Sequence, residues 1–460
     1  MKESSRGANT MTHRRVTSSA RVSFLFLAVV ARTMSAQEPD TSRMARDSLV
    51  ARLERAEEAI ELLRQQIAAQ SEAEVRTLSR VSLDLTGRAL VNAFANSGRG
   101  NSSDVPQFVL ADGADFPPLE DFPRGSVGLS ARQTMLGLIV AITDVLGGEL
   151  IGDVHADFFS VQQPGASGRV APTVRLRTLK AQLRWRNAEL MAGQEVPLVA
   201  GLNPTSTASL GTPTFATAGN LWLWLPQLRA TLRTSGALRF MLQGAVLAPN
   251  SGEPIPGTNR DRDVDVAERS RRPFVQGRIG ARWGGEEQAG EIGVGVHGGW
   301  FARTSTTGGR EDMHQSWAVA TDLLVPLGPL VLRGELYRGA LLRGLGGGGI
   351  GQNFGPDGLP LIDRGGWAQL ELRLTPTASL GTGCGADDPH VVLPATGPVS
   401  PTRTRNVACE AHLTLRPGGP LLVGFEARRM ETTWIARATM AAVERKFRSD
   451  HVNLAVGFEF

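Results

Sequence analysis

The chain ends in the stretch His451-Val452-Asn453-Leu454-Ala455-Val456-Gly457-Phe458-Glu459-Phe460, in which apolar residues stand at every second position. Side chains of a β-strand point to alternate faces, so the pattern predicts a strand with one apolar and one polar face. The same alternation recurs upstream, from residue 81 onward and at 149–158, 227–233 and 367–374. A chain built from many such segments is predicted to be all-β.

Alternation alone fits two folds. A soluble β-sandwich buries its apolar face in a core, whereas a transmembrane barrel turns that face to lipid and its polar face to a wet lumen. Residues 1–36 favour the barrel, because a basic stretch followed by a ten-residue, mostly apolar run at 22–31 predicts a secretory signal peptide cleaved after Ala36. The final strand, ending in Phe460, resembles the terminal strand of bacterial outer-membrane proteins, which implies the barrel-assembly machinery as a partner.

The composition agrees with an exported barrel. Gly accounts for 53 of 460 residues, and the 20% charged and 41% hydrophobic fractions argue against a disordered chain. No run of 18 apolar residues follows residue 36, which excludes helical membrane spans. The net charge of +4 is too small to indicate nucleic-acid binding, and two Cys allow one disulfide at most.

Turn signals give a strand count. Seven short connections are predicted at 143–147, 186–187, 235–236, 284–289, 326–329, 376–377 and 417–419. Eight longer ones are predicted at 96–125, 161–172, 198–225, 248–272, 304–313, 342–365, 386–403 and 434–449. Their alternation predicts a 16-stranded antiparallel transmembrane β-barrel over 79–460, with both ends on the periplasmic side. Interfacial girdles are expected at Trp185 and Trp283 on the periplasmic side, and at Trp300, Trp317, Trp367 and Trp434 on the external side.

Residues 37–78 are predicted to form an N-terminal α-helical coiled-coil stalk in the periplasm. From 44 to 70 there is no Gly or Pro, and apolar residues are spaced alternately by four and three, at Leu49, Leu53, Ala56, Ile60, Leu63 and Ile67. An amphipathic helix packed on its own domain is the alternative, although its apolar face would be broader.

A signal, a short coiled coil and a sixteen-stranded barrel together resemble the DcaP-type trimeric porins. Within the barrel, four stretches resemble the family's sequence patterns. They are 149–159, Ala192-Gly193-Gln194, Trp224-Leu225-Pro226-Gln227-Leu228-Arg229 and Ala386-Asp387-Asp388-Pro389. The resemblance covers most of 45–460 and implies a homotrimeric outer-membrane diffusion channel, in a family associated with small anionic solutes. The chain departs from the family in its few aromatic residues and in a loop at 198–225 that has no charge.

Strand parity predicts the side chains that line the lumen. The sixth to eighth strands carry Arg229, Arg233, Arg239, Arg278 and Arg282, the fourth carries Lys180 and Arg184, and the third carries Glu149, Asp153 and Asp157. Rows of cations and anions on opposite sides of the lumen would produce an electric field across it. The uncharged loop 198–225 is expected to fold inward, so that Arg229, Arg239 and Arg278 on the wall set the sign of the constriction. Salt-bridged lumen packing is the alternative reading.

No catalytic residue, cofactor or metal site is predicted, and the protein is not expected to be an enzyme. The seven His lack metal-ligand spacing, the Asp261-Arg262-Asp263-Val264-Asp265 run lacks the turn Gly of a calcium loop, and 344–349 lack the Lys-Ser/Thr of a phosphate loop. Cys384 and Cys409 lie near the external ends of adjacent strands at lipid-facing parity, which predicts either a disulfide or two buried thiols.

The sequence therefore predicts an outer-membrane porin, a passive channel for small hydrophilic solutes with a mild preference for anions such as carboxylates. The alternative is a structural protein, plugged in its barrel, that tethers the envelope by contact between its stalk and peptidoglycan. Conductance in planar bilayers would separate the two.

Overall fold

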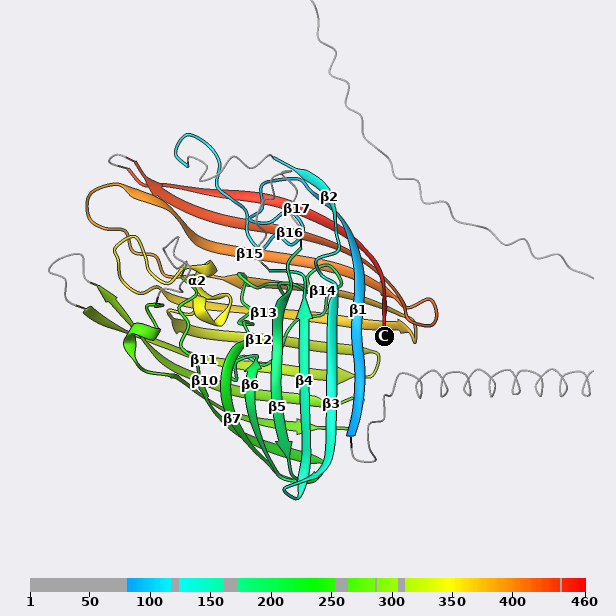
Figure 1. Ribbon diagram of the computed structural model, residues 1–460. Coiled ribbons are helices and arrows are strands. Elements are labelled where there is room, and N and C mark those ends of the chain that lie inside the picture. Colours follow the sequence, from blue (N-terminus) through cyan, green and yellow to red (C-terminus); the bar gives the residue numbers. More distant parts are fainter. Residues whose placement is uncertain are drawn as a thin grey trace, which may run out of the picture. The chain divides into compact units, whose positions relative to one another are not determined.

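The computed structural model describes residues 81–116, 124–160, 172–253, 264–285, 288–304, 311–438 and 441–460 (Figure 1). The signal peptide expected at 1–36 and the stalk expected at 37–78 lie outside these residues. No helix among the described residues is long and apolar enough to span a membrane.

Strands make up nearly all of the regular structure. They are β1 (Val81–Asn96), β2 (Ser126–Ser130), β3 (Met135–Val145), β4 (Gly148–Asp157), β5 (Arg175–Arg184), β6 (Ala188–Glu195), β7 (Leu225–Arg233), β8 (Leu238–Leu247), β9 (Phe274–Trp283), β10 (Gly290–Thr304), β11 (Glu311–Leu327), β12 (Leu330–Ala340), β13 (Ile362–Thr375), β14 (Ala378–Asp387), β15 (Val399–Leu415), β16 (Leu421–Arg437) and β17 (Val443–Glu459). Three short helical turns lie between strands, η1 (Glu268–Ser270), η2 (Arg343–Leu345) and α2 (Gly348–Gly351).

The sheet closes on itself into an antiparallel barrel. All strands that follow each other in the chain pair, except β2 and β3, and β1 pairs with both β17 and β3 (Figure 1). The short β2 pairs with the second half of β1 and β3 with the first half, so β2 and β3 are one barrel strand interrupted at 131–134. The barrel therefore has sixteen strands, as predicted, and the predicted sixth to eighth strands are β7, β8 and β9.

Most predicted turns are confirmed, with one error at the end of the chain. The 434–449 segment was expected to be a long loop, but β16 continues to Arg437 and β17 begins at Val443. In this extension the outward residues are charged rather than apolar, and Lys446 and Arg448 both pair with Glu431 on β16. Alternation of charged with apolar residues was therefore misread as a loop.

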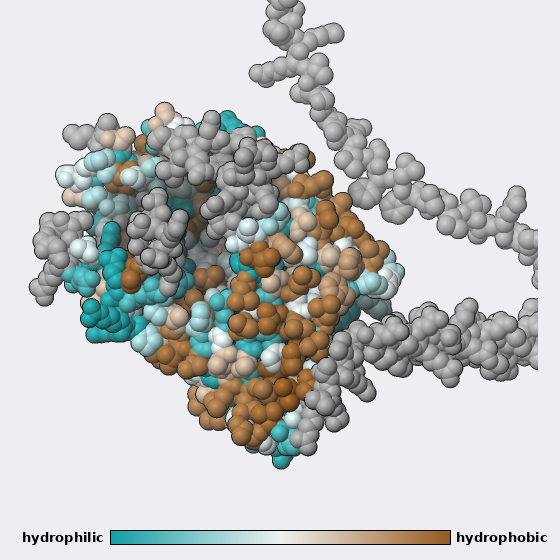
Figure 2. Space-filling model, viewed as in Figure 1, coloured by the Kyte–Doolittle hydropathy of each residue, from teal (hydrophilic) through white to brown (hydrophobic). Residues whose placement is uncertain are grey.

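The two faces of the strands differ as the alternation predicts. Along β7, outward Leu228 and Leu232 are 65% and 57% exposed, whereas inward Gln227 and Thr231 are buried. Hydrophobic side chains gather over the strand wall in Figure 2. Such an exposed apolar wall is unfavourable in water and matches the lipid-facing band of a membrane barrel.

The predicted external girdle is partly wrong. Trp300 and Trp317 have outward parity, between the buried inward residues of β10 and β11. Trp367 and Trp434 instead have inward parity and are only 3% and 4% exposed. They pack on external connections that fold into the lumen, since Trp367 stacks on Phe215 and the Trp434 indole donates to the Val109 carbonyl.

The core of the molecule lies inside the barrel. Three long connections fold inward, namely loop 1 (described at 97–116), loop 3 (196–224) and loop 6 (341–361). Their apolar residues bury one another against the strands, as Val199 and Leu221 of loop 3 do with Leu342 and Leu345 of loop 6. The glycine-rich segment of loop 6 is thus packed in the barrel mouth rather than extended outside it.

Candidate pore constriction

Loop 3 crosses the lumen and is bound to its wall by side chains from many strands. Its polar groups contact the wall at Gln276 of β9, Gln369 of β13, Glu426 of β16, Asn92 of β1 and Gln133 between β2 and β3. An uncharged loop inside a barrel must still pair its backbone N–H and C=O groups, and the polar wall side chains do so. The prediction that loop 3 folds inward is confirmed.

Loop 3 covers one part of the wall and leaves another part open. The inward side chains of Gln369, Glu426 and Arg428 beneath it are at most 3% exposed. On β4, β5 and β6 the side chains of Asp153, Lys180 and Glu195 keep between 12% and 18% of their surface accessible. Water therefore reaches the lumen at this level along β4 to β6.

The predicted acidic row of β4 is paired with cations on its neighbour β5. The Lys180 ammonium lies 3.1 Å from an Asp153 oxygen and also binds Glu195. Asp157 accepts bonds from Arg175 at 2.6 Å and Arg177 at 3.1 Å. Asp153 and Asp157 are therefore not free charges facing a distant row of arginines. At this level of β4 to β6, three cations pair with three carboxylates, so their charges cancel.

Arg175 and Arg177 were missed because the strand has an irregularity. Counting back from Lys180 in steps of two selects Thr178 and Leu176 as inward. In the β4–β5 register His155 pairs with Thr178 and Ala156 with Leu176, so one residue of β5 is skipped. A bulge of this kind reverses the parity beyond it and turns both arginines inward. The sequence carries one sign of this reversal, because the outward residues Leu176 and Leu179 are three positions apart whereas those that follow are two apart.

The two arginines lie among aromatic rings. The guanidinium carbons of Arg175 and Arg177 are 5.2 and 4.6 Å from the Trp224 ring, and that of Arg132 is 4.0 Å from Phe159. Trp224 is the last residue of loop 3. Stacking holds the guanidinium planes in place with their charge retained.

Arg278 is buried and neutralised. Its guanidinium binds both oxygens of Asp322 and donates to Glu291 at 2.8 Å. The Asp322 side chain has no exposed surface, and the Arg278 side chain is 4% exposed. The acids come from β10 and β11, so only the register of three strands brings them to Arg278. The expectation that Arg278 sets the sign of the constriction is therefore not supported by its surroundings.

The other predicted cations lie toward the periplasmic turns. Arg233 and Arg184 both bind Glu189, at 2.7 and 3.2 Å. Arg239 lies opposite Arg282 in the β8–β9 register and donates to the Gly284 carbonyl in the next turn. Placing Arg239 at the depth of loop 3 was wrong, because β8 starts at the periplasmic turn and Arg239 is its second residue. Glu149 lies opposite Arg184 at the same end.

Arg229, like Lys180, is a predicted cation that lies at the level of loop 3, but it has no carboxylate partner among the described residues. It donates to the Val196 carbonyl at 2.6 Å and to Gln227 at 2.9 Å, and no ion pair within the described ranges includes it. The three cations and three carboxylates of β4 to β6 balance one another. With Arg229 the wall from β4 to β7 therefore has one positive charge in excess at this level.

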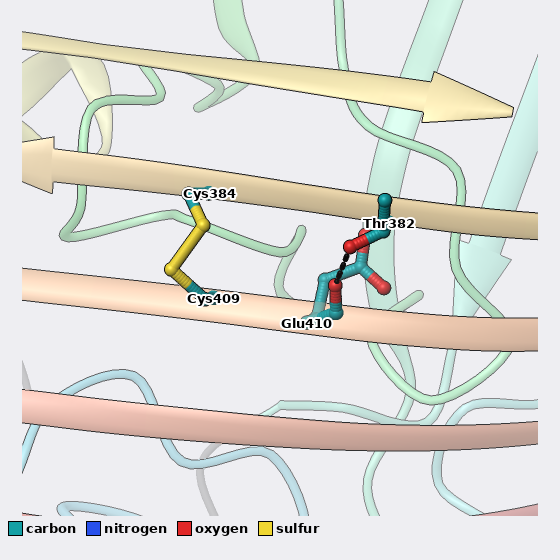
Figure 3. The surroundings of a disulfide bond; sticks show 4 residues. All are labelled: Thr382, Cys384, Cys409 and Glu410. Atoms are coloured by element: carbon teal, nitrogen blue, oxygen red, sulfur yellow. Dashed lines mark hydrogen bonds between the residues drawn. A yellow bond between two sulfur atoms is a disulfide. The ribbon is translucent and has the colours of Figure 1, made fainter.

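Cys384 and Cys409 form a disulfide (Figure 3). They lie directly opposite each other in the β14–β15 register; Glu410 is next to Cys409, and Thr382 is two residues before Cys384. Their parity is outward, so the bond staples two neighbouring strands on the lipid-facing side.

A buried group of metal-ligating residues lies under loop 3. The side-chain ligand atoms of Glu410, His412 and Glu426 are all within 4.8 Å of one another. Their oxygens are already engaged, because Gln369 donates to Glu410 and Arg428 donates to Glu426 at 2.6 Å. Ser206 of loop 3 also donates to Glu426. These hydrogen bonds indicate that the three residues help to hold loop 3 against the barrel wall.

The fold is similar to that of solved outer-membrane proteins. The outer membrane channel DcaP of Acinetobacter baumannii is 15% identical, with 84% of this chain and all of that chain covered and a TM-score of 0.58. An anion-selective porin from Comamonas acidovorans is 11% identical, with 83% of this chain and all of that chain covered and a TM-score of 0.48. No family model and no curated protein matches the sequence. The chain thus has the fold of the DcaP outer-membrane channel, as its sequence resemblance indicated.

Proposed function

We propose that the protein is an outer-membrane porin, a passive channel for small hydrophilic solutes with a mild preference for anions such as carboxylates. One observation carries the proposal. Loop 3 covers the inward face of β13 and β16, while charged side chains on β4 to β6 stay accessible beside it. DcaP is an outer membrane channel, and the shared fold supports the same role.

The charges at this level would act on passing solutes. Loop 3 contributes no charge, so the sign of the passage is set by the wall, where Arg229 is in excess. In a narrow passage with low-dielectric walls one charge acts more strongly than in bulk water. A guanidinium binds a carboxylate well. Because the other cations already have carboxylate partners, a passing anion would be held weakly and released, as conduction requires.

The cellular arrangement is part of the proposal. The barrel would lie in the outer membrane, with the 37–78 stalk in the periplasm and three chains associated through barrel walls and stalks. Phe460 closes the barrel seam by two backbone hydrogen bonds to Gly87, and its side chain is 45% exposed. An accessible aromatic side chain at this position is consistent with its recognition by the assembly machinery before the barrel closes.

A structural tether is the second candidate function. It is favoured by loops 1, 3 and 6, whose side chains fill much of the outer half of the lumen. In this reading the barrel anchors a stalk that contacts peptidoglycan. Reconstitution in planar bilayers decides between them, because stepwise conductance supports the porin and its absence supports the tether.

A further inference from the structure

The outward wall of β4 to β9 has two adjoining hollows. The lower one has a volume of about 730 Å³ and lies where small residues, Ala181, Ala192, Ala230 and Gly244, interrupt the larger lipid-facing side chains. The upper one, about 710 Å³, lies at the loop end of the same strands. Both are lined by Leu228 and Val246, so they form one continuous groove. Each is within the size range of ligand sites, about 300–1,000 Å³.

The groove is apolar along its length and is bordered by arginines at its loop end. The lower hollow is lined mostly by Leu, Val, Ala and Gly side chains of outward parity. The upper hollow ends at Arg271 and Arg272, both exposed, just before β9 begins. Within the described ranges neither arginine takes part in an ion pair, and Arg272 stacks over outward-facing Trp300 at 4.8 Å. Among the described residues, Glu268 is the acidic residue that lines this hollow, and its carboxylate accepts a hydrogen bond from the Asp265 backbone amide.

Given the proposed membrane orientation, on which this inference rests, the basic end lies at the level of the outer-leaflet head groups. We propose that the groove binds a phosphorylated, acylated lipid of the outer leaflet. Its phosphate would lie on the Arg271 and Arg272 guanidiniums, and an acyl chain would lie in the hollow over Ala192, Ala230 and Gly244. Guanidinium forks match phosphate geometry, and apolar burial holds the chain.

Native mass spectrometry of the detergent-solubilised protein would test this with bis-phosphorylated lipid A, its dephosphorylated form and phosphatidylcholine. Wild type should retain bis-phosphorylated lipid A preferentially. The double variant Arg271→Glu/Arg272→Glu should bind lipid A roughly 30-fold or more weakly, since each basic residue near an anionic surface raises the affinity about fivefold. Arg269→Glu is the matched control, because Arg269 is exposed in the same turn but lines neither hollow. It should change binding little.

A second variant tests the apolar half without changing charge. Ala230→Phe would fill the lower hollow and should weaken lipid A binding while leaving the weak retention of phosphatidylcholine unchanged.

Three results would overturn the proposal in favour of another explanation. If Arg269→Glu lost as much lipid A binding as the double arginine variant, the lipid would be attracted by the positive charge of the whole turn rather than bound in the groove. Displacement by inorganic phosphate alone would overturn it in favour of a free-anion site, and a changed oligomeric mass in favour of a subunit interface. A wild type that conducts but shows no lipid A preference overturns only this inference, whereas a silent barrel that binds lipid A overturns only the proposed channel.

Discussion

Replacing Arg278 with Leu should destabilise the barrel strongly. The substitution leaves the Asp322 carboxylate, which has no exposed surface, without its cation, and it removes one partner from Glu291. Removing one member of a buried pair typically costs about 3–5 kcal/mol, because the remaining charge is uncompensated. Asp322 should account for most of this, since the Glu291 side chain retains 19% exposure and can be hydrated.

Arg229→Leu is the matched control. Arg229 is an inward arginine on a strand close by, but its partners are a carbonyl and an amide rather than carboxylates. Its removal should cost roughly 1–2 kcal/mol, the size expected for lost hydrogen bonds.

The assay is urea unfolding of protein reconstituted in lipid vesicles, followed by tryptophan fluorescence. In the Arg278→Leu background, Asp322→Leu should recover much of the lost stability, because it removes the unpaired buried charge. The reasoning is refuted if Arg278→Leu costs no more than Arg229→Leu, or if the second substitution adds to the loss.

Three further outcomes are expected. Arg229→Glu should shift the reversal potential across a KCl gradient toward cation preference, because it inverts the cation of β4 to β7 that has no carboxylate partner among the described residues; an unchanged value would place the selectivity elsewhere. Replacing Cys384 and Cys409 with Ser should lower the unfolding free energy by about 3.5 kcal/mol, as estimated for a cross-link closing 25 residues, without changing conductance; equal stability in reduced and oxidised wild type would contradict this. Changing Ile60 and Leu63 to Asp should weaken trimers in cross-linking experiments and leave the barrel inserted, and loss of the inserted barrel would assign the stalk to folding.

Alternation and turn residues, together with the signal at 1–36 and the terminal strand, predicted the barrel. Period-two patterning and Gly or Pro turns are local signals, so strand number, closure and most boundaries follow from the sequence. Loop 3 was also predictable, because a long uncharged connection next to polar strands has its partners inside the lumen. The paired positions of Cys384 and Cys409 followed from counting parity up two adjacent strands.

The pairing of charges could not be predicted from single strands. Arg278 meets Asp322 and Glu291 only through the register of three strands, which the sequence of one strand does not contain. The bulge that turns Arg175 and Arg177 inward is different, because the spacing of three between Leu176 and Leu179 marks it within one strand. As a result, two opposed rows of charge were expected where the structure has local ion pairs and one arginine left over.

The most direct test of the central claim is the reversal potential of single wild-type channels in a planar bilayer under a KCl gradient. The account predicts stepwise openings and a reversal potential displaced modestly toward that of chloride, as one excess positive charge beside an uncharged loop requires. A silent bilayer containing correctly folded protein, or a displacement toward that of potassium, would contradict it.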